Sequence, residues 1–130
     1  MTESFPDRIR IQDTYMVGRV RWFILATRFR QFTSHSTGTI IVPAGFHTDG
    51  ASIPRAFHTI IGPYGPYFGA AIIHDYLYSK AAAESYPHIT RKIADQIFDE
   101  GMYNLGVPWR HRAPMYRAVR MFGSRSYQKR

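Results

Sequence analysis

Alternating apolar and polar positions over residues 8–43 predict β-strands. Successive side chains of Val20–Ala26 fall on opposite sides of an extended chain, and Thr39–Val42 forms a second apolar run. The polar segment Gln31–Gly38 separates the two runs, and Pro43 ends the second one because proline cannot donate to a ladder. A hairpin between the two runs is the simplest pairing, so we expect a small antiparallel sheet with one covered face.

The second half of the chain changes to the three- and four-residue spacing of amphipathic helices. Tyr67–Ala81 carries one apolar stripe of about four turns, which the preceding Gly-Pro pair can start. Thr90 can cap a second helix that Gly106 closes, and a third, shorter helix is expected from near Pro114 to Gly123. Strands followed by helices predict an α+β fold, with about three C-terminal helices packed on one face of a small N-terminal antiparallel sheet.

A chain of 130 residues corresponds to a single domain. Its parts are a mainly β segment over residues 1–45, a long loop over 46–65, a helical segment over 66–123 and a basic tail over 124–130. The loop is rich in Gly, Pro, Ser and Thr, and loops of that length inside a compact domain are usually functional or well packed.

Several classes of protein are excluded by composition. The absence of cysteine excludes disulfide scaffolds, cysteine zinc sites, iron–sulfur clusters and thiol nucleophiles. The longest apolar run, around Phe68–Ile73, is too short to span a bilayer. The N-terminus carries Glu3 and Asp7 and no apolar region, which does not support a signal peptide, so we expect synthesis in a cytoplasm and no membrane span.

The net charge is strongly positive and unevenly distributed. Lys and Arg number 17 against 9 acidic residues, a formal charge of +8, and no acidic residue follows Glu100. Most of these cations are arginines, the cation that proteins prefer at packed interfaces and on phosphates. The charge favours an acidic protein surface, phosphate or nucleic acid as a partner, although no nucleic-acid-binding motif is present and a merely solvated basic surface explains it equally well.

One constellation of residues has the chemistry of a metal or catalytic site: Asp49, His74, Asp75 and Asp95. Three carboxylates and an imidazole suit a divalent cation such as Mg²⁺, Mn²⁺ or Zn²⁺, which is the only cofactor the sequence suggests. His74 and Asp49 are the candidates for catalysis, with His74 as a ligand or general base. The order of His47, His74-Asp75 and Asp95 is similar to that of metal phosphohydrolases, but those enzymes are all-helical. A Ser52–His74–Asp triad lacks the GxSxG turn.

Each of these residues also has a structural explanation. Asp49 before Gly50 suits an Asx turn. His74 lies on the apolar stripe of its helix, where a histidine is more often a hydrogen-bonded core residue than a ligand. Arg91 and Asp95 have the spacing of an ion pair along one helix.

The aromatic content, 15% of the chain, is high for so small a core. We therefore expect some aromatic side chains to be exposed, beside arginines, at an interface. The candidates are Tyr64, Tyr67, Phe68, Trp109, Arg117 and Arg120.

An ordered set of motifs between Thr39 and Gly123 resembles a known family. The motifs are the run from Thr48-Asp49-Gly50 to Pro54, the segment His74-Asp75-Tyr76-Leu77-Tyr78, the segment Arg91–Asp95 and a closing segment over residues 116–123. They resemble domain of unknown function 1353, which is found in tailed phages, prophages and some bacteria. The resemblance implies a phage or prophage gene product and assigns no activity and no catalytic residue. His47 departs from the apolar residue that the family has at that position.

These observations lead to one main hypothesis and two alternatives. The main hypothesis is a structural or interaction component of a tailed-phage particle, at the tail or the neck. Such a component binds neighbouring virion proteins in an oligomeric assembly and is therefore located in the virion. The first alternative is a metal-dependent hydrolase that acts on host cell wall or nucleic acid. The second is a phage factor that binds a host protein.

Overall fold

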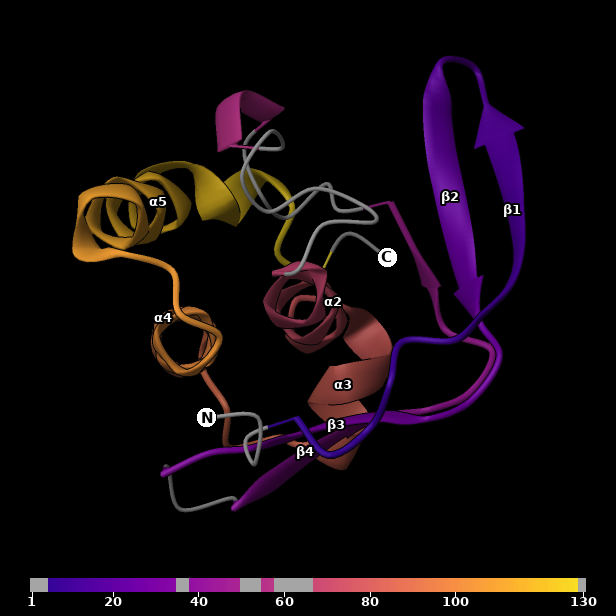
Figure 1. Ribbon diagram of the computed structural model, residues 1–130, viewed down its shortest axis with the longest axis horizontal. Coiled ribbons are helices and arrows are strands. Elements are labelled where there is room, and N and C mark those ends of the chain that lie inside the picture. Colours follow the sequence, from indigo (N-terminus) through magenta and orange to yellow (C-terminus); the bar gives the residue numbers. More distant parts are fainter. Residues whose placement is uncertain (1–4, 35–37, 50–54, 58–66, 129–130) are drawn as a thin grey trace.

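The computed structural model describes residues 5–34, 38–49, 55–57 and 67–128, and the strands precede the helices (Figure 1). The strands are β1 (Ile11–Val17), β2 (Val20–Leu25), β3 (Phe29–Phe32), β4 (Thr39–Val42) and β5 (His47–Thr48). The helices of the described residues are α2 (Phe68–Leu77), α3 (Lys80–Ser85), α4 (Arg91–Asn104) and α5 (Trp109–Phe122), with short 3₁₀ turns η2 (Arg55–Phe57) and η3 (Gly123–Arg125). The α+β class is confirmed, with four α-helices in these ranges rather than three.

The strands form two antiparallel sheets instead of one. One sheet has the order β1-β2-β5, and the other is the pair β3-β4. Tyr15 pairs with Trp22 in the first sheet, and Phe29 pairs with Val42 in the second. The predicted hairpin between Val20–Ala26 and Thr39–Val42 is therefore wrong.

A tight turn explains why β2 pairs with the strand before it. Only Gly18 and Arg19 connect β1 to β2, and Gly18 has a φ of 62°, as the first position of a two-residue hairpin turn requires. The predicted β segment over residues 8–43 includes β1, but its pairing with β2 was not predicted, because polar residues interrupt the apolar alternation over residues 12–14. It also placed Gln31 in a turn, whereas Gln31 is a buried residue of β3 whose amide donates to the Ile97 carbonyl (3.1 Å).

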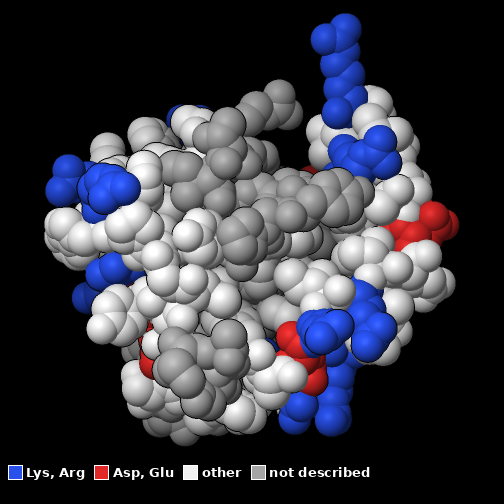
Figure 2. All heavy atoms as spheres, viewed as in Figure 1, with Lys and Arg blue, Asp and Glu red and all other residues white. Residues whose placement is uncertain are grey.

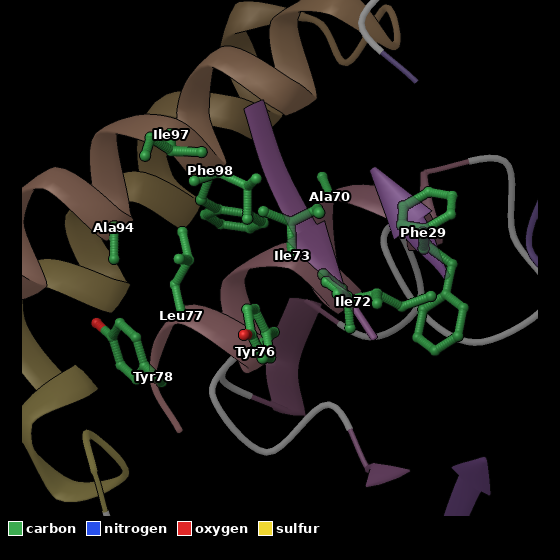
Figure 3. Packing of buried hydrophobic residues seen from close by; sticks show 14 of the residues in the cluster. Phe29, Ala70, Ile72, Ile73, Tyr76, Leu77, Tyr78, Ala94, Ile97 and Phe98 are labelled. Carbon is green, nitrogen blue, oxygen red and sulfur yellow. The ribbon is translucent and has the colours of Figure 1, made fainter. Parts of the chain in front are cut away.

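Helix α2 is the centre of the core. All ten of its residues are buried, and it contacts α4 on one side and strands β3, β4 and β5 on the other (Figure 1). Figure 3 shows Ile73 and Leu77 directed toward Ile97 and Phe98 of α4. Its eight other residues are apolar or aromatic, and even His74 and Asp75 are buried, which leaves α2 no solvent-facing side. Within the described residues, no helix combines the length and apolar character needed to cross a membrane.

The single helix predicted over Tyr67–Ala81 is interrupted at Ser79. Ser79 has an extended backbone, with φ of −81° and ψ of 158°, and its hydroxyl accepts a hydrogen bond from the Ala82 amide (3.3 Å). The same hydroxyl donates to the Tyr76 carbonyl (2.6 Å), so Ser79 ends α2 and caps α3.

Thr90 caps α4 as predicted, since its hydroxyl accepts from the Ile93 amide (3.2 Å), and Gly106 follows the helix with a φ of 93°. Helix α5, however, begins at Trp109, not near Pro114. Pro114 removes one hydrogen bond inside the helix. Its immediate neighbour Met115 is fully buried, so tertiary packing holds the helix through this position.

We predict that Ser79→Ala lowers the free energy of unfolding by about 1 kcal/mol, because the α3 cap is lost. Chemical denaturation of the variant measures this. Ser124→Ala, at an exposed position of η3, is the control. Equal stability of the two variants would contradict the capping role of Ser79.

Candidate functional site

A network of hydrogen bonds surrounds the carboxylate of Asp95 in the middle of the helical half. Its Oδ1 accepts from Nε2 of His74 (2.7 Å) and from the hydroxyl of Tyr78 (2.6 Å). Its Oδ2 accepts from Nη1 of Arg120 (2.7 Å). The side chains of His74 and Asp95 are 0% exposed. The network therefore joins α2, α4 and α5 in the interior.

The surroundings of Asp95 keep it ionised. Burial raises the pKa of Asp95, but the hydrogen bonds from His74, Tyr78 and Arg120 outweigh burial and hold that pKa below its usual value. Burial, together with the bond to Asp95, raises the pKa of Tyr78, so its hydroxyl keeps the proton that it donates. A carboxylate with both oxygens occupied in this way is a structural acceptor, with little capacity left for a metal ion or for proton transfer.

The predicted pairing of Arg91 with Asp95 is present, although the distance from Nη1 to Oδ2 is 3.8 Å. The Arg91 guanidinium also donates to the carbonyls of Val119 (3.1 Å) and Arg120 (3.3 Å) in the last turn of α5. The Val119 carbonyl also accepts a hydrogen bond from the backbone N–H of Gly123, which caps α5, and a cation is favourable at a helix C-terminus. A Cβ at Gly123 would overlap the Tyr78 hydroxyl, which shows how closely the end of α5 approaches α2.

Asp75 points away from this network. Its Oδ2 accepts from the hydroxyl of Thr48 in β5 (2.6 Å), and the residue is 2% exposed. Because successive helical residues are rotated by about 100°, His74 and Asp75 point from different sides of α2. Asp75 and His47 both line a surface hollow of about 290 Å³, and Asp95 is not among the residues that line it.

The structure therefore does not bring the four candidate ligands together. His74 and Asp95 form one pair, Asp75 bonds Thr48, and Asp49 lies half-buried after β5. Over the described ranges, which include all four, no three His, Cys, Asp or Glu side chains form a group that could hold a metal ion. Ser52, the predicted nucleophile of a triad, lies outside the described residues.

The C-terminal helices enclose a surface hollow of about 450 Å³, here called the α4–α5 groove. Its lining residues are Asp99 of α4 and Trp109, Ala113, Tyr116, Arg117, Arg120 and Met121 of α5. The α5 residues recur every three or four positions and so form one stripe of the helix. Three of the predicted interface residues meet here, namely Trp109, Arg117 and Arg120. The same spacing along α5 could have identified its other lining residues, Ala113, Tyr116 and Met121.

Arg112 organises one edge of the α4–α5 groove. Its Nε donates to Oδ1 of Asp99 (3.0 Å), and its guanidinium lies 5.1 Å from the ring centre of Tyr103 and 5.3 Å from that of Trp109. Both rings are exposed, at 65% and 69% respectively. Burial raises the pKa of Asp99, and the Arg112 guanidinium opposes that rise. Cation–π contacts thus hold two aromatic rings in place at the surface.

The other three predicted interface residues, Phe68, Tyr67 and Tyr64, are not among the residues that line the α4–α5 groove. Phe68 is only 4% exposed and packs edge-on against Phe23 with ring centres 5.7 Å apart, so the prediction that it is an interface residue is wrong. It belongs to the buried helix α2, whose apolar residues point in every direction. Tyr67 is half-buried against the core. Tyr64 lies outside the described residues.

Basic side chains gather at both ends of the face shown in Figure 2, over the side where α5 lies and over the hairpin of β1 and β2. Helix α5 contains no acidic residue. Two of its arginines nevertheless bind carboxylates, Arg112 that of Asp99 and Arg120 that of Asp95. The positive electrostatic potential over α5 is therefore weaker than its number of arginines indicates.

Comparison with known proteins identifies the family of the chain. The model of the family described as "Protein of unknown function (DUF1353)" matches residues 23–119. The chain belongs to this family. The match includes Thr48, Asp49, His74, Asp75 and Asp95, and it ends immediately before Arg120.

One curated relative of this DUF1353 protein is the uncharacterized protein y4jT of Sinorhizobium fredii (strain NBRC 101917 / NGR234). The two are 42% identical over 85 residues, which is 63% of this chain and 23% of the relative. The chain thus spans about a quarter of the length of that relative. No solved structure matches the chain.

For this DUF1353 protein we predict that Asp95→Asn lowers the free energy of unfolding by about 3–5 kcal/mol, because it leaves buried donors without their charged acceptor. The effect depends on pH. The folded-state pKa of Asp95 is lowered, so its contribution is complete above the unfolded pKa of about 3.9 and is lost as the pH falls through the folded pKa. Denaturant titrations over the acidic range measure both effects.

Asp99→Asn is the matched control for this experiment. The pKa of Asp99 is shifted upward, so its removal does not abolish a loss of stability in acid. We expect the wild type and Asp99→Asn to lose stability as the pH falls through the acidic range, and Asp95→Asn to lose less. The same acid dependence in all three proteins would disprove the assignment to Asp95.

Proposed function

We propose that this protein is a structural, protein-binding component of a tailed-phage particle, at the tail or the neck, and that it docks onto a neighbouring virion protein through the α4–α5 groove. The observation that carries the proposal is the exposure of Trp109 and Met121, at 69% and 64%, beside the cation of Arg117. Aromatic residues, methionine and arginine are the residue types enriched at the centres of protein interfaces.

The surrounding surface supports a docking role. Among the described residues, half of the large hydrophobic side chains that are exposed belong to the end of α4 and to α5: Tyr103, Trp109, Met121 and Phe122. Apolar side chains gathered on one part of a surface indicate an interaction site, whereas scattered single ones do not. The groove is also built on two helices of 14 residues each, which present it on a rigid support.

The particle context depends on the resemblance to a family found in tailed phages and prophages. The hydrolase alternative has less support from the geometry, because His74 and Asp95 are sealed inside a saturated network while Asp75 bonds to β5. In the proposed function that network holds the helices together and performs no chemistry.

The decisive experiment is the copy number of the chain in purified particles of the phage or induced prophage that encodes it, by quantitative mass spectrometry against the major capsid protein. We expect a fixed ratio that matches the symmetry of a tail or neck. The double variant Trp109→Ala/Arg117→Ala should fold normally, because both side chains are exposed, and should be missing from particles or strongly depleted.

The matched control is Val17→Ala/Arg19→Ala at the tip of the β1–β2 hairpin, which also removes one exposed apolar side chain and one arginine. This control should enter particles at the wild-type ratio. Absence of the wild-type chain from particles would refute the virion assignment and favour a factor that binds a host protein. Equal incorporation of both double variants would refute the role of the groove.

A further inference from the structure

Arg120 connects the buried network to the α4–α5 groove. Its Nη1 donates to Asp95 in the interior, while the residue lines the groove and its side chain is 31% exposed. Asp95 is the only hydrogen-bond acceptor that the described residues offer to the Arg120 side chain. A guanidinium has five N–H donors, so donors remain for a ligand in the groove.

We propose that the α4–α5 groove binds an acidic segment of a partner protein, with one carboxylate of the segment on Arg120 and an adjacent apolar side chain against Trp109 and Met121. The inference rests on the proposed docking function and specifies the chemistry of the partner. Arginine binds a carboxylate through two parallel hydrogen bonds, provided that its planar group is held in position. Asp95 supplies that restraint, and His74 and Tyr78 hold Asp95 in turn.

The charges around the groove favour a segment with few carboxylates over a polyanion. Asp99 already binds Arg112, and Asp95 shares the charge of Arg120. Arg117 is therefore the one lining arginine that binds no carboxylate among the described residues. Nucleic acid requires many phosphate contacts for its affinity, and this groove offers few cations for them.

A second copy of the chain is disfavoured as the occupant because α5 carries too many cations to face itself. Helix α5 carries Arg110, Arg112, Arg117 and Arg120 and no acidic residue, so two copies facing each other through this helix would place like charges together. The apolar lining, by contrast, suits an aromatic or aliphatic side chain. The volume of about 450 Å³ lies within the range of pockets that bind ligands.

The test uses the full chain and a displayed library of random peptides. Peptides selected by the wild-type protein should be enriched in Asp or Glu next to an aromatic or aliphatic residue. A selected peptide is then labelled, and its binding is measured by fluorescence anisotropy beside a copy in which every acidic residue is replaced by its amide. The amide copy should bind at least about tenfold more weakly, since hydrogen bonds between charged groups are the stronger ones.

Arg120→Lys keeps the positive charge and loses the planar fork, so it should weaken binding of the acidic peptide about fivefold to tenfold. Arg110→Lys, at an exposed position of α5 that does not line the groove, is the matched control and should change binding less than twofold. Amide chemical shifts from ¹⁵N–¹H NMR should change around the groove residues of α4 and α5 and not on the β1–β2 hairpin. The same spectra show whether each variant is folded.

Several outcomes would overturn the inference: selection of basic or uncharged peptides, equal binding of the acidic and amide peptides, equal effects of the two lysine variants, or tighter binding of a single-stranded oligonucleotide than of the peptide. Self-association of the free chain through α5 in sedimentation would identify a second copy as the occupant. If particle incorporation requires Trp109 and Arg117 while acidic peptides fail, the docking function stands and the partner chemistry is wrong. If peptides bind as expected and particles lack the chain, the groove stands and the virion assignment is wrong.

Discussion

The buried carboxylate of Asp95 is the constraint on which the helical half of this protein depends. An ionised carboxylate without partners in a protein interior costs several kcal/mol. Here His74 of α2, Tyr78 immediately after α2 and Arg120 of α5 supply the hydrogen bonds that offset this cost. They can do so only when both helices lie in fixed positions against α4, so the requirement to satisfy one charge specifies one arrangement of three helices.

Asp75, the residue after His74, forms a second attachment of helix α2. Asp75 bonds Thr48 of β5 on a different side of α2 from His74, so two adjacent residues attach the central helix to α4 and to the sheet. A His-Asp pair of this kind has the composition of a metal site and the geometry of a structural clamp. The Arg120 side chain connects these buried residues to the surface, because its hydrogen bond to Asp95 orients the guanidinium that lines the α4–α5 groove.

Local patterns predicted the features that depend on neighbours along the chain. These include the order of strands and helices, the Thr90 cap, and the pairing of Arg91 with Asp95 four residues apart on one helix. The errors arose where distant parts compete. The apolar stripe continues past Ser79 in the sequence, so the pattern does not show the helix break. The capping hydrogen bond of the Ser79 hydroxyl forms only when the backbone becomes extended at that residue. The pairing of β2 depended on a two-residue turn whose preceding strand is polar in the middle.

The sequence by itself determined the fold class, and it named Trp109, Arg117 and Arg120, which the structure places in one groove, as interface candidates. Residue type and helical spacing are enough for those conclusions. Only the tertiary structure decided that Phe68 is buried, that His74 joins Asp95 while Asp75 turns to Thr48, and that Arg120 belongs to both the network and the groove. The physical reason is that hydrogen bonds between residues distant in the chain depend on how the helices pack, and packing leaves no periodic signal in the sequence.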